Sequence, residues 1–129
     1  MRIIRKSAKA RGRQFQKRIA KEIQDIFSLE ERDVVSTPAS VPGVDIILSQ
    51  KAKMLFPYSV ECKNQETTSI WGWMKQAEQN CGKLNPLLVF TRNHSKTYVM
   101  IEWSKFLQLV KYTAAVEKWV EGEENEKED

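Results

Sequence analysis

Three charged residues stand at spacings that could support hydrolysis of a phosphodiester. Asp45 begins the apolar run Val44-Asp45-Ile46-Ile47-Leu48, and fifteen residues separate it from Glu61-Cys62-Lys63. Side chains two apart on a strand share a face, so Glu61 and Lys63 should point the same way. If the strand that contains Asp45 lies beside them, two carboxylates and one ammonium group meet at one place.

Two carboxylates that are buried together repel each other and lose hydration, which costs several kcal/mol unless a cation lies between them. Oxygen ligands of this kind suit Mg²⁺, with Mn²⁺ as a substitute, and waters and a substrate phosphate complete the coordination. Lys63 would then orient an attacking water or offset the charge on the phosphate. The alternative is a solvent-facing Glu61–Lys63 pair on an edge strand, which the spacing alone leaves open.

Two features favour the site over the surface pair. Asp45 follows the Pro42-Gly43 turn and is a lone acid in an apolar strand. The chain also begins with a dense basic segment, since residues 1–21 carry nine Lys and Arg and no acid. Such a segment favours binding to a polyanion, and we expect phosphate contacts from these basic residues at its start: Arg5, Lys6, Lys9, Arg11 and Arg13.

The pattern of apolar residues predicts the elements that must position these side chains. We predict helices at about 13–27, 70–83 and 105–120, a helical turn at 49–54, and strands at 33–36, 44–48, 56–63, 86–91 and 97–101. In the first helix, Phe15, Ile19, Ile23, Ile26 and Phe27 form the apolar stripe, and Gln24 is placed on the opposite, polar side. The order predicts an α/β fold with a central mixed sheet of about five strands flanked by helices.

Length and charge define the expected organisation of the chain. The 129 residues suffice for one core. We predict a basic flexible arm at 1–11, a single domain at 12–120 and an acidic disordered tail at 121–129, because residues 117–129 carry seven acids and two lysines. Two Cys and one His argue against a zinc site, a disulfide framework or a His-based triad. No apolar run is long enough to cross a bilayer, so we expect no membrane association.

The chain has a helix, then a loop that ends in an acid, then a strand with Glu-x-Lys, and then another helix. This order resembles the PD-(D/E)XK nuclease superfamily over about residues 10–103. Within it, small phage nucleases and archaeal-type Holliday junction resolvases are the most similar groups. The supporting segments are Lys9-Ala10-Arg11-Gly12-Arg13, Pro42-Gly43-Val44-Asp45-Ile46 and Ser59-Val60-Glu61-Cys62-Lys63. Val44 stands where the superfamily name has Pro.

The resemblance implies a role for each matched residue. Asp45 and Glu61 would hold Mg²⁺, the Cys62 carbonyl could add a ligand, and Lys63 would be the catalytic lysine. The early helical acid of the resolvases falls on Gln16, and Glu22 is the other candidate for that role; we rank Gln16 slightly higher. Two further residues would contact DNA: Ser36, before Asp45, and Gln76, in the following helix.

Function is expected on the same basis. We predict a Mg²⁺-dependent, structure-selective DNA endonuclease with a restriction-endonuclease-like core, acting on four-way junctions as a C₂ homodimer in the cytoplasm of a bacterial or phage-infected cell. One alternative is a less selective phage nuclease for flaps, ends or duplex. Another is a catalytically inactive nucleic-acid-binding protein, against which Asp45, Glu61 and Lys63 argue.

Overall fold

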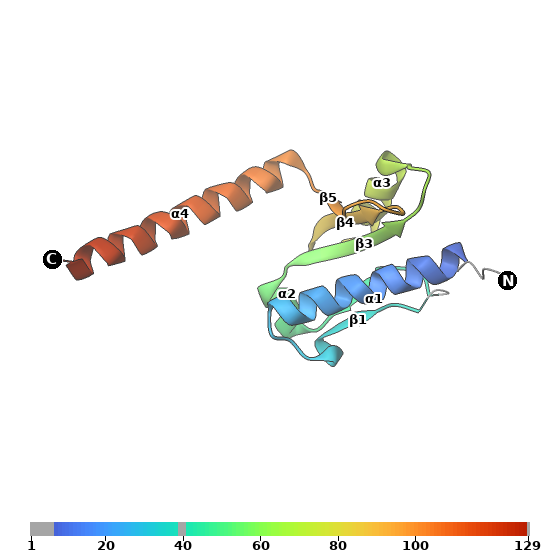
Figure 1. The fold of residues 1–129 in the computed structure, drawn as a ribbon, viewed down its shortest axis with the longest axis horizontal. Coiled ribbons are helices and arrows are strands. Elements are labelled where there is room, and N and C mark those ends of the chain that lie inside the picture. Colours follow the sequence, from blue (N-terminus) through green and yellow to red (C-terminus); the bar gives the residue numbers. More distant parts are fainter. Residues whose placement is uncertain (1–6, 39–40, 129) are drawn as a thin grey trace.

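A computed structural model describes residues 7–38 and 41–128 of the chain. Helices and strands alternate along the chain, as the apolar pattern predicts (Figure 1). The elements are α1 (Ala8–Ile26), a short 3-10 helix η1 (Glu31–Asp33), β1 (Val34–Ser36), β2 (Ile46–Leu48), α2 (Gln50–Leu55), β3 (Tyr58–Asn64), α3 (Ile70–Asn80), β4 (Asn85–Thr91), β5 (Tyr98–Met100) and α4 (Trp103–Glu128).

The five strands divide between two sheets. β1 and β2 pair antiparallel, with Val35 opposite Ile47. β3 and β4 pair parallel, with Glu61 opposite Leu88, and β5 adds to β4 antiparallel. The α/β class, the mixed sheet and the flanking helices are confirmed. The predicted single sheet of about five strands is not observed, because the mixed sheet has three strands and β1 and β2 form a separate sheet.

The three-stranded sheet separates two apolar clusters, because successive residues of a strand point to opposite faces. Val89 of β4 packs in the cluster that contains Phe15 and Ile19 of α1. Its neighbour Leu88 packs in the cluster that contains Trp73 of α3. The two helices therefore cover opposite faces of the sheet. Glu61, which is level with Leu88, lies on the α3 face, and Cys62 lies on the α1 face.

The first helix begins earlier than the apolar stripe predicts. Ser7 caps it, since its side-chain oxygen accepts the Ala10 N–H at 3.1 Å. Residues 8–11, predicted as part of the flexible arm, are therefore helical. The placement of Gln24 on the polar side is wrong: its side chain is buried, and Nε2 donates to the Val34 carbonyl at 2.8 Å. This bond satisfies a backbone acceptor where α1 meets β1, so a polar residue is tolerated within the apolar contact.

The last helix extends beyond its predicted end. α4 continues to Glu128 and includes most of the predicted acidic tail, because Glu and Lys are good helix formers even when their charges suggest disorder. It projects away from the sheets in Figure 1, and among the described elements none packs extensively against it. None of the helices in the described part of the chain is apolar over enough length to cross a membrane.

Candidate active site

Asp45 is fastened to β3 by its side chain. Its Oδ2 accepts the backbone N–H of Cys62 at 2.7 Å, and the residue lies immediately before β2 rather than within a strand that pairs with β3. The carboxylate thus takes the place of a strand carbonyl at the β3 edge that faces away from β4. This bond brings Asp45 next to Glu61 and Lys63 without the strand pairing on which the sequence prediction depended.

The backbone that carries Asp45 is fixed from two sides. Thr37 donates its N–H to the Asp45 carbonyl at 2.8 Å and its hydroxyl to the Val44 carbonyl at 2.6 Å. Asn80, at the end of α3, donates to the Gly43 carbonyl at 3.4 Å. Gly43 has φ +112°, a conformation that a side chain would strain, so the Pro-Gly turn needs glycine here. Neither Thr37 nor Asn80 belongs to a recognisable sequence pattern, so no local signal predicts their role.

Glu61 and Lys63 lie on the same face of β3, as their spacing requires. The Glu61 side chain is 2% exposed, and the Lys63 Nζ lies 3.5 Å from its Oε1. The Lys63 side chain is 20% exposed, so the ammonium lies between the buried carboxyl and solvent. The alternative of a solvent-facing Glu61–Lys63 pair is wrong, because the Glu61 side chain is buried.

The two carboxyl groups perturb each other. Burial, and next to it the nearby Asp45 carboxylate, raise the pKa of Glu61 to about 7 against the opposing effect of Lys63. Burial also raises the pKa of Asp45, whereas the Cys62 N–H, Lys63 and a hydrogen bond with Glu61 oppose that rise. The two acids therefore affect each other's titration, and burial disfavours the ionised form of both.

Cys62 contributes its backbone rather than its thiol. Its side chain belongs to the apolar cluster under α1. Burial is the main cause that raises the pKa of this thiol, and the carboxylates of Asp45 and Glu61 add to it, so thiolate chemistry is disfavoured.

A divalent cation fits this donor set. Within the described segments, no three His, Cys, Asp or Glu side chains cluster to hold a metal ion, so the acids available are Asp45 and Glu61. Glu61 is buried and Asp45 is half-buried, and Lys63 compensates the full ionisation of these two carboxyls only in part. One or two carboxylates plus water and phosphate oxygens is the usual environment of Mg²⁺ in proteins, and the charge of the cation would favour the ionised forms.

Of the two candidates for a third polar ligand, only Gln16 lies toward the loop of Asp45. Gln16 and Ser36 line a hollow of about 300 Å³ together with Thr37, the residue that holds the Asp45 backbone. Glu22 is exposed and pairs with Arg18, with 3.9 Å between Nε and Oε1. The helix wheel placed both near the sheet, but α1 presents only Gln16 to this side.

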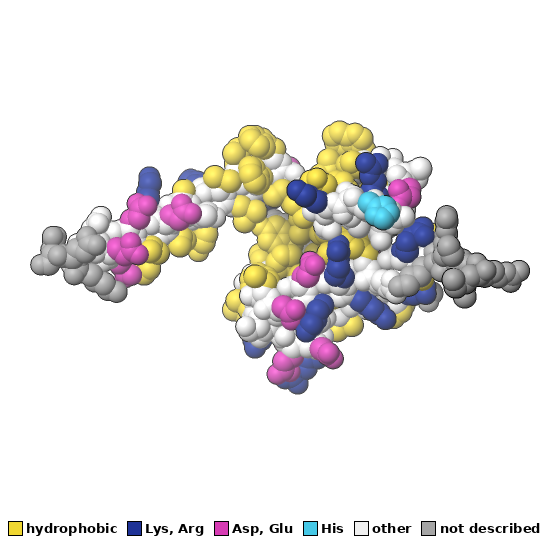
Figure 2. All heavy atoms as spheres, in the orientation of Figure 1, with side chains coloured by type: hydrophobic (Ala, Val, Ile, Leu, Met, Phe, Trp, Pro, Cys, Tyr) yellow, Lys and Arg dark blue, Asp and Glu magenta, His cyan; other side chains and the backbone are white. Residues whose placement is uncertain are grey.

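The remaining predicted DNA contacts are scattered. Arg5 and Lys6 lie outside the described residues. Lys9 and Arg13 are exposed on the first turns of α1, and Arg11 lines a different pocket from Gln16. Gln76 is exposed on α3. Figure 2 shows several Lys and Arg side chains over α1, the first described helix of the chain.

Comparison with known proteins supplies the classification. No curated protein and no solved structure matches this chain significantly. A sequence model of one family, described as "Phage putative PDDEXK endonuclease", matches residues 7–129. This match includes Asp45, Glu61 and Lys63 and extends through α4, beyond the region of the resemblance found from the motifs. The chain belongs to the phage PDDEXK endonuclease family.

Proposed function

We propose that this protein is a Mg²⁺-dependent endodeoxyribonuclease that cleaves branched DNA. The observation that carries the proposal is the Asp45 carboxyl, held against β3 by the Cys62 N–H and next to Glu61 and Lys63. The family supports a nuclease, and the arrangement supports hydrolysis, because two acids and one lysine meet at a partly open strand edge.

Each residue has a distinct part in the proposed chemistry. Asp45 and Glu61, with the Cys62 carbonyl, would hold Mg²⁺ or Mn²⁺, which supplies Lewis-acid activation of the phosphodiester. Lys63 donates hydrogen bonds to the attacking water or to the phosphate oxygens, and its positive charge stabilises the charge that develops there. Gln16 would hydrogen-bond water at the edge of the site from α1, together with Ser36 on the adjoining strand.

Branched DNA is the proposed substrate because the chain pairs a small catalytic core with basic residues along α1, and contacts from basic side chains to phosphates hold DNA without reading its sequence. Symmetric nicks across a four-way junction need two active sites, so the junction-resolving form of the proposal requires a homodimer. A less selective nuclease for flaps, ends or duplex would use the same site.

The test compares a labelled four-way junction with linear duplexes of the same arm sequences. Each is incubated with Mg²⁺, with Mn²⁺ or with EDTA, and Lys63→Met serves as the inactive variant. We expect paired nicks in the junction only with metal and only in the wild type. Equal cleavage of junction and duplex would favour the less selective nuclease, and tight binding without cleavage would favour an inactive binding protein.

A further inference from the structure

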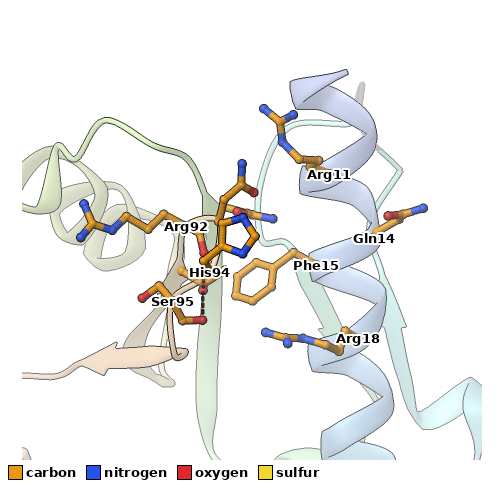
Figure 3. Close-up of a pocket in the computed structure, with 10 residues that line it drawn as sticks. Arg11, Gln14, Phe15, Arg18, Arg92, His94 and Ser95 are labelled. Carbon is orange, nitrogen blue, oxygen red and sulfur yellow. Dashed lines mark hydrogen bonds between the residues drawn. The ribbon is translucent and has the colours of Figure 1, made fainter. Parts of the chain in front are cut away.

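A second pocket lies on the opposite face of the sheet from Glu61 and Lys63. It has a volume of about 410 Å³ and opens between the N-terminal half of α1 and the ends of β3 and β4 (Figure 3). Six of the residues that line it are Arg11, Arg18, Asn64, Thr91, Arg92 and His94. As far as the described residues define it, the lining has no acidic side chain, which is typical of an anion site.

The side chains on the two walls converge. In Figure 3, Arg11 and Arg18 extend from α1, and His94 faces them across the ring of Phe15, whereas Arg92 points away from the helix. Arg18 lies over the Phe15 ring at 5.0 Å and donates to the Thr97 hydroxyl at 2.6 Å. These contacts fix its guanidinium at the rim, although Glu22 shares part of its charge.

The turn that carries His94 is held in place before any ligand arrives. Asn93 donates its N–H to Glu66 Oε1 at 2.9 Å, and Ser95 donates its N–H to the Arg92 carbonyl at 3.2 Å. His94 itself has φ +58°, which is uncommon outside glycine and is seen at sites that hold ligands. The strained backbone presents the imidazole to the pocket.

We propose that this pocket binds an internal backbone phosphate of the DNA, away from the bond that is cut. The inference rests on the proposed function and names a second contact for the same substrate. Lys63 and Asn64 are consecutive on β3, and their side chains point to opposite faces. A DNA strand that crosses the end of β3 would therefore meet the proposed active site on one side and this pocket on the other.

The test measures DNA affinity in EDTA, so it does not depend on cleavage. Arg11→Gln removes one cation from the α1 wall of the pocket, and His94→Asn keeps a residue that tolerates positive φ. Arg32→Gln is the matched control, because Arg32 pairs with Glu30 at 2.8 Å in η1, beyond the other end of α1. Fluorescence anisotropy at several salt concentrations gives both affinity and salt slope.

We expect Arg11→Gln and His94→Asn each to weaken binding roughly five- to tenfold, and Arg11→Gln to reduce the salt slope by about 0.9. Arg32→Gln should change neither. If the wild type binds DNA and neither pocket variant binds it more weakly, the pocket proposal is overturned and the nuclease proposal stands. If the wild type does not bind DNA at all, the proposed function is contradicted. Duplexes with and without a 5′-phosphate distinguish the ligand: a loss seen only with the 5′-phosphate would overturn the internal site.

A second inference comes from α4. Its apolar side chains are solvent-exposed along the helix, including Trp103 (69%), Tyr112 (75%) and Trp119 (64%). Apolar residues occur nearly all round its first half, as in helices that are buried on several sides. Yellow side chains follow the helix in Figure 2 and continue into the region where it leaves the sheets.

We infer that a second copy of this chain covers α4, with the two helices antiparallel. The first half of α4, residues 103–116, carries Lys105 and Lys111 and no acid, whereas residues 117–128 carry six acids and two lysines. Antiparallel pairing places the basic half of each helix beside the acidic half of the other. Leu109, Tyr112, Val116 and Trp119 recur every three or four residues along one side of the helix, and their exposed fractions of 43%, 75%, 46% and 64% leave an apolar seam for the partner helix.

Light scattering after size exclusion tests the dimer. We expect twice the 15.0 kDa chain mass for the wild type and for Ala114→Glu, on the side of α4 away from Tyr112 and Val116, and a single chain for Val116→Glu. Lys111→Glu should weaken the dimer if the helices are antiparallel, and an unchanged dimer in that variant would exclude this orientation. A monomeric wild type with intact helical circular dichroism would overturn the dimer, whether or not the protein cleaves DNA.

Discussion

The Asp45 carboxylate and the Cys62 backbone N–H form a 2.7 Å hydrogen bond between the loop before β2 and the middle of β3. Side chains alternate along β3, so Glu61 and Lys63 lie on one face and Cys62 on the other. The bond therefore holds Asp45 beside the other proposed metal ligand, Glu61, while the Cys62 thiol packs in the core. Removing the charge and removing the bond can therefore be separated by mutation.

Asp45→Asn should abolish cleavage and preserve both the fold and DNA binding. The amide oxygen of Asn can still accept the Cys62 N–H, but a neutral ligand holds Mg²⁺ less well. Asp45→Ala should also lower stability, by about 1 kcal/mol, because the Cys62 N–H loses its partner. Cleavage assays, anisotropy and thermal melts of the two variants measure these effects. Cleavage by Asp45→Asn at the wild-type rate would show that the site is wrongly assigned.

The metal-free protein should lose stability as the pH rises from about 4.5 to about 7. Glu61 has a pKa near 7 in the folded state, above its ordinary 4.5, so the folded protein binds the proton more strongly than the unfolded chain. Its contribution is fully present below the ordinary value and is lost as the pH passes through the folded one, by on the order of 3 kcal/mol. Urea unfolding in EDTA between pH 4 and pH 8 measures this slope.

Two comparisons identify Glu61 as the source of that slope. Glu61→Gln, which cannot ionise, should flatten the curve and make the metal-free protein more stable at pH 8. Added Mg²⁺ should raise the stability of the wild type at pH 8 but not at pH 5, because the carboxylates must be deprotonated to bind it. The same slope in Glu61→Gln and the wild type would contradict the assignment.

Gln16 rather than Glu22 should affect the metal dependence of cleavage. Gln16→Ala should raise the Mg²⁺ concentration needed for half-maximal cleavage, roughly 10-fold if its amide orients water at the site. Gln16→Glu should lower that concentration, since it adds an acid beside the Asp45 loop. Glu22→Gln is the control, because Glu22 is an exposed partner of Arg18. A shift in Glu22→Gln alone would reverse our ranking.

Deletion of residues 1–6 should weaken DNA binding and its salt dependence without affecting α1. The deletion removes Arg2, Arg5 and Lys6 but keeps the Ser7 cap. If all three reach phosphates, the log–log salt slope should fall by about 2.7. Deletion of 1–11 would also remove the first helical turn, so it confounds charge with folding. An unchanged slope would mean that these residues do not contact DNA.

The position of α1 shows why sequence periodicity places helices better than it places their ends and their polar residues. Phe15, Ile19 and Ile23 repeat at helical spacing and face the core as predicted, but Ile26, predicted in the same stripe, is 76% exposed. Ser7 begins the helix through one side-chain hydrogen bond, which periodicity does not detect. Gln24 is buried because the Val34 carbonyl comes within reach of its amide, and no local signal indicates that partner.

The sequence alone determined which residue types can do chemistry and which of them share a face. Glu61 and Lys63 are two apart on a strand of alternating side chains, so their common direction follows from local geometry. Only the tertiary structure decided how Asp45 reaches them. Thr37 fixes that loop locally, and Asn80 and the Cys62 N–H fix it across long sequence separations. The burial that raises the pKa of Glu61 is also a product of packing between distant segments, which no local pattern encodes.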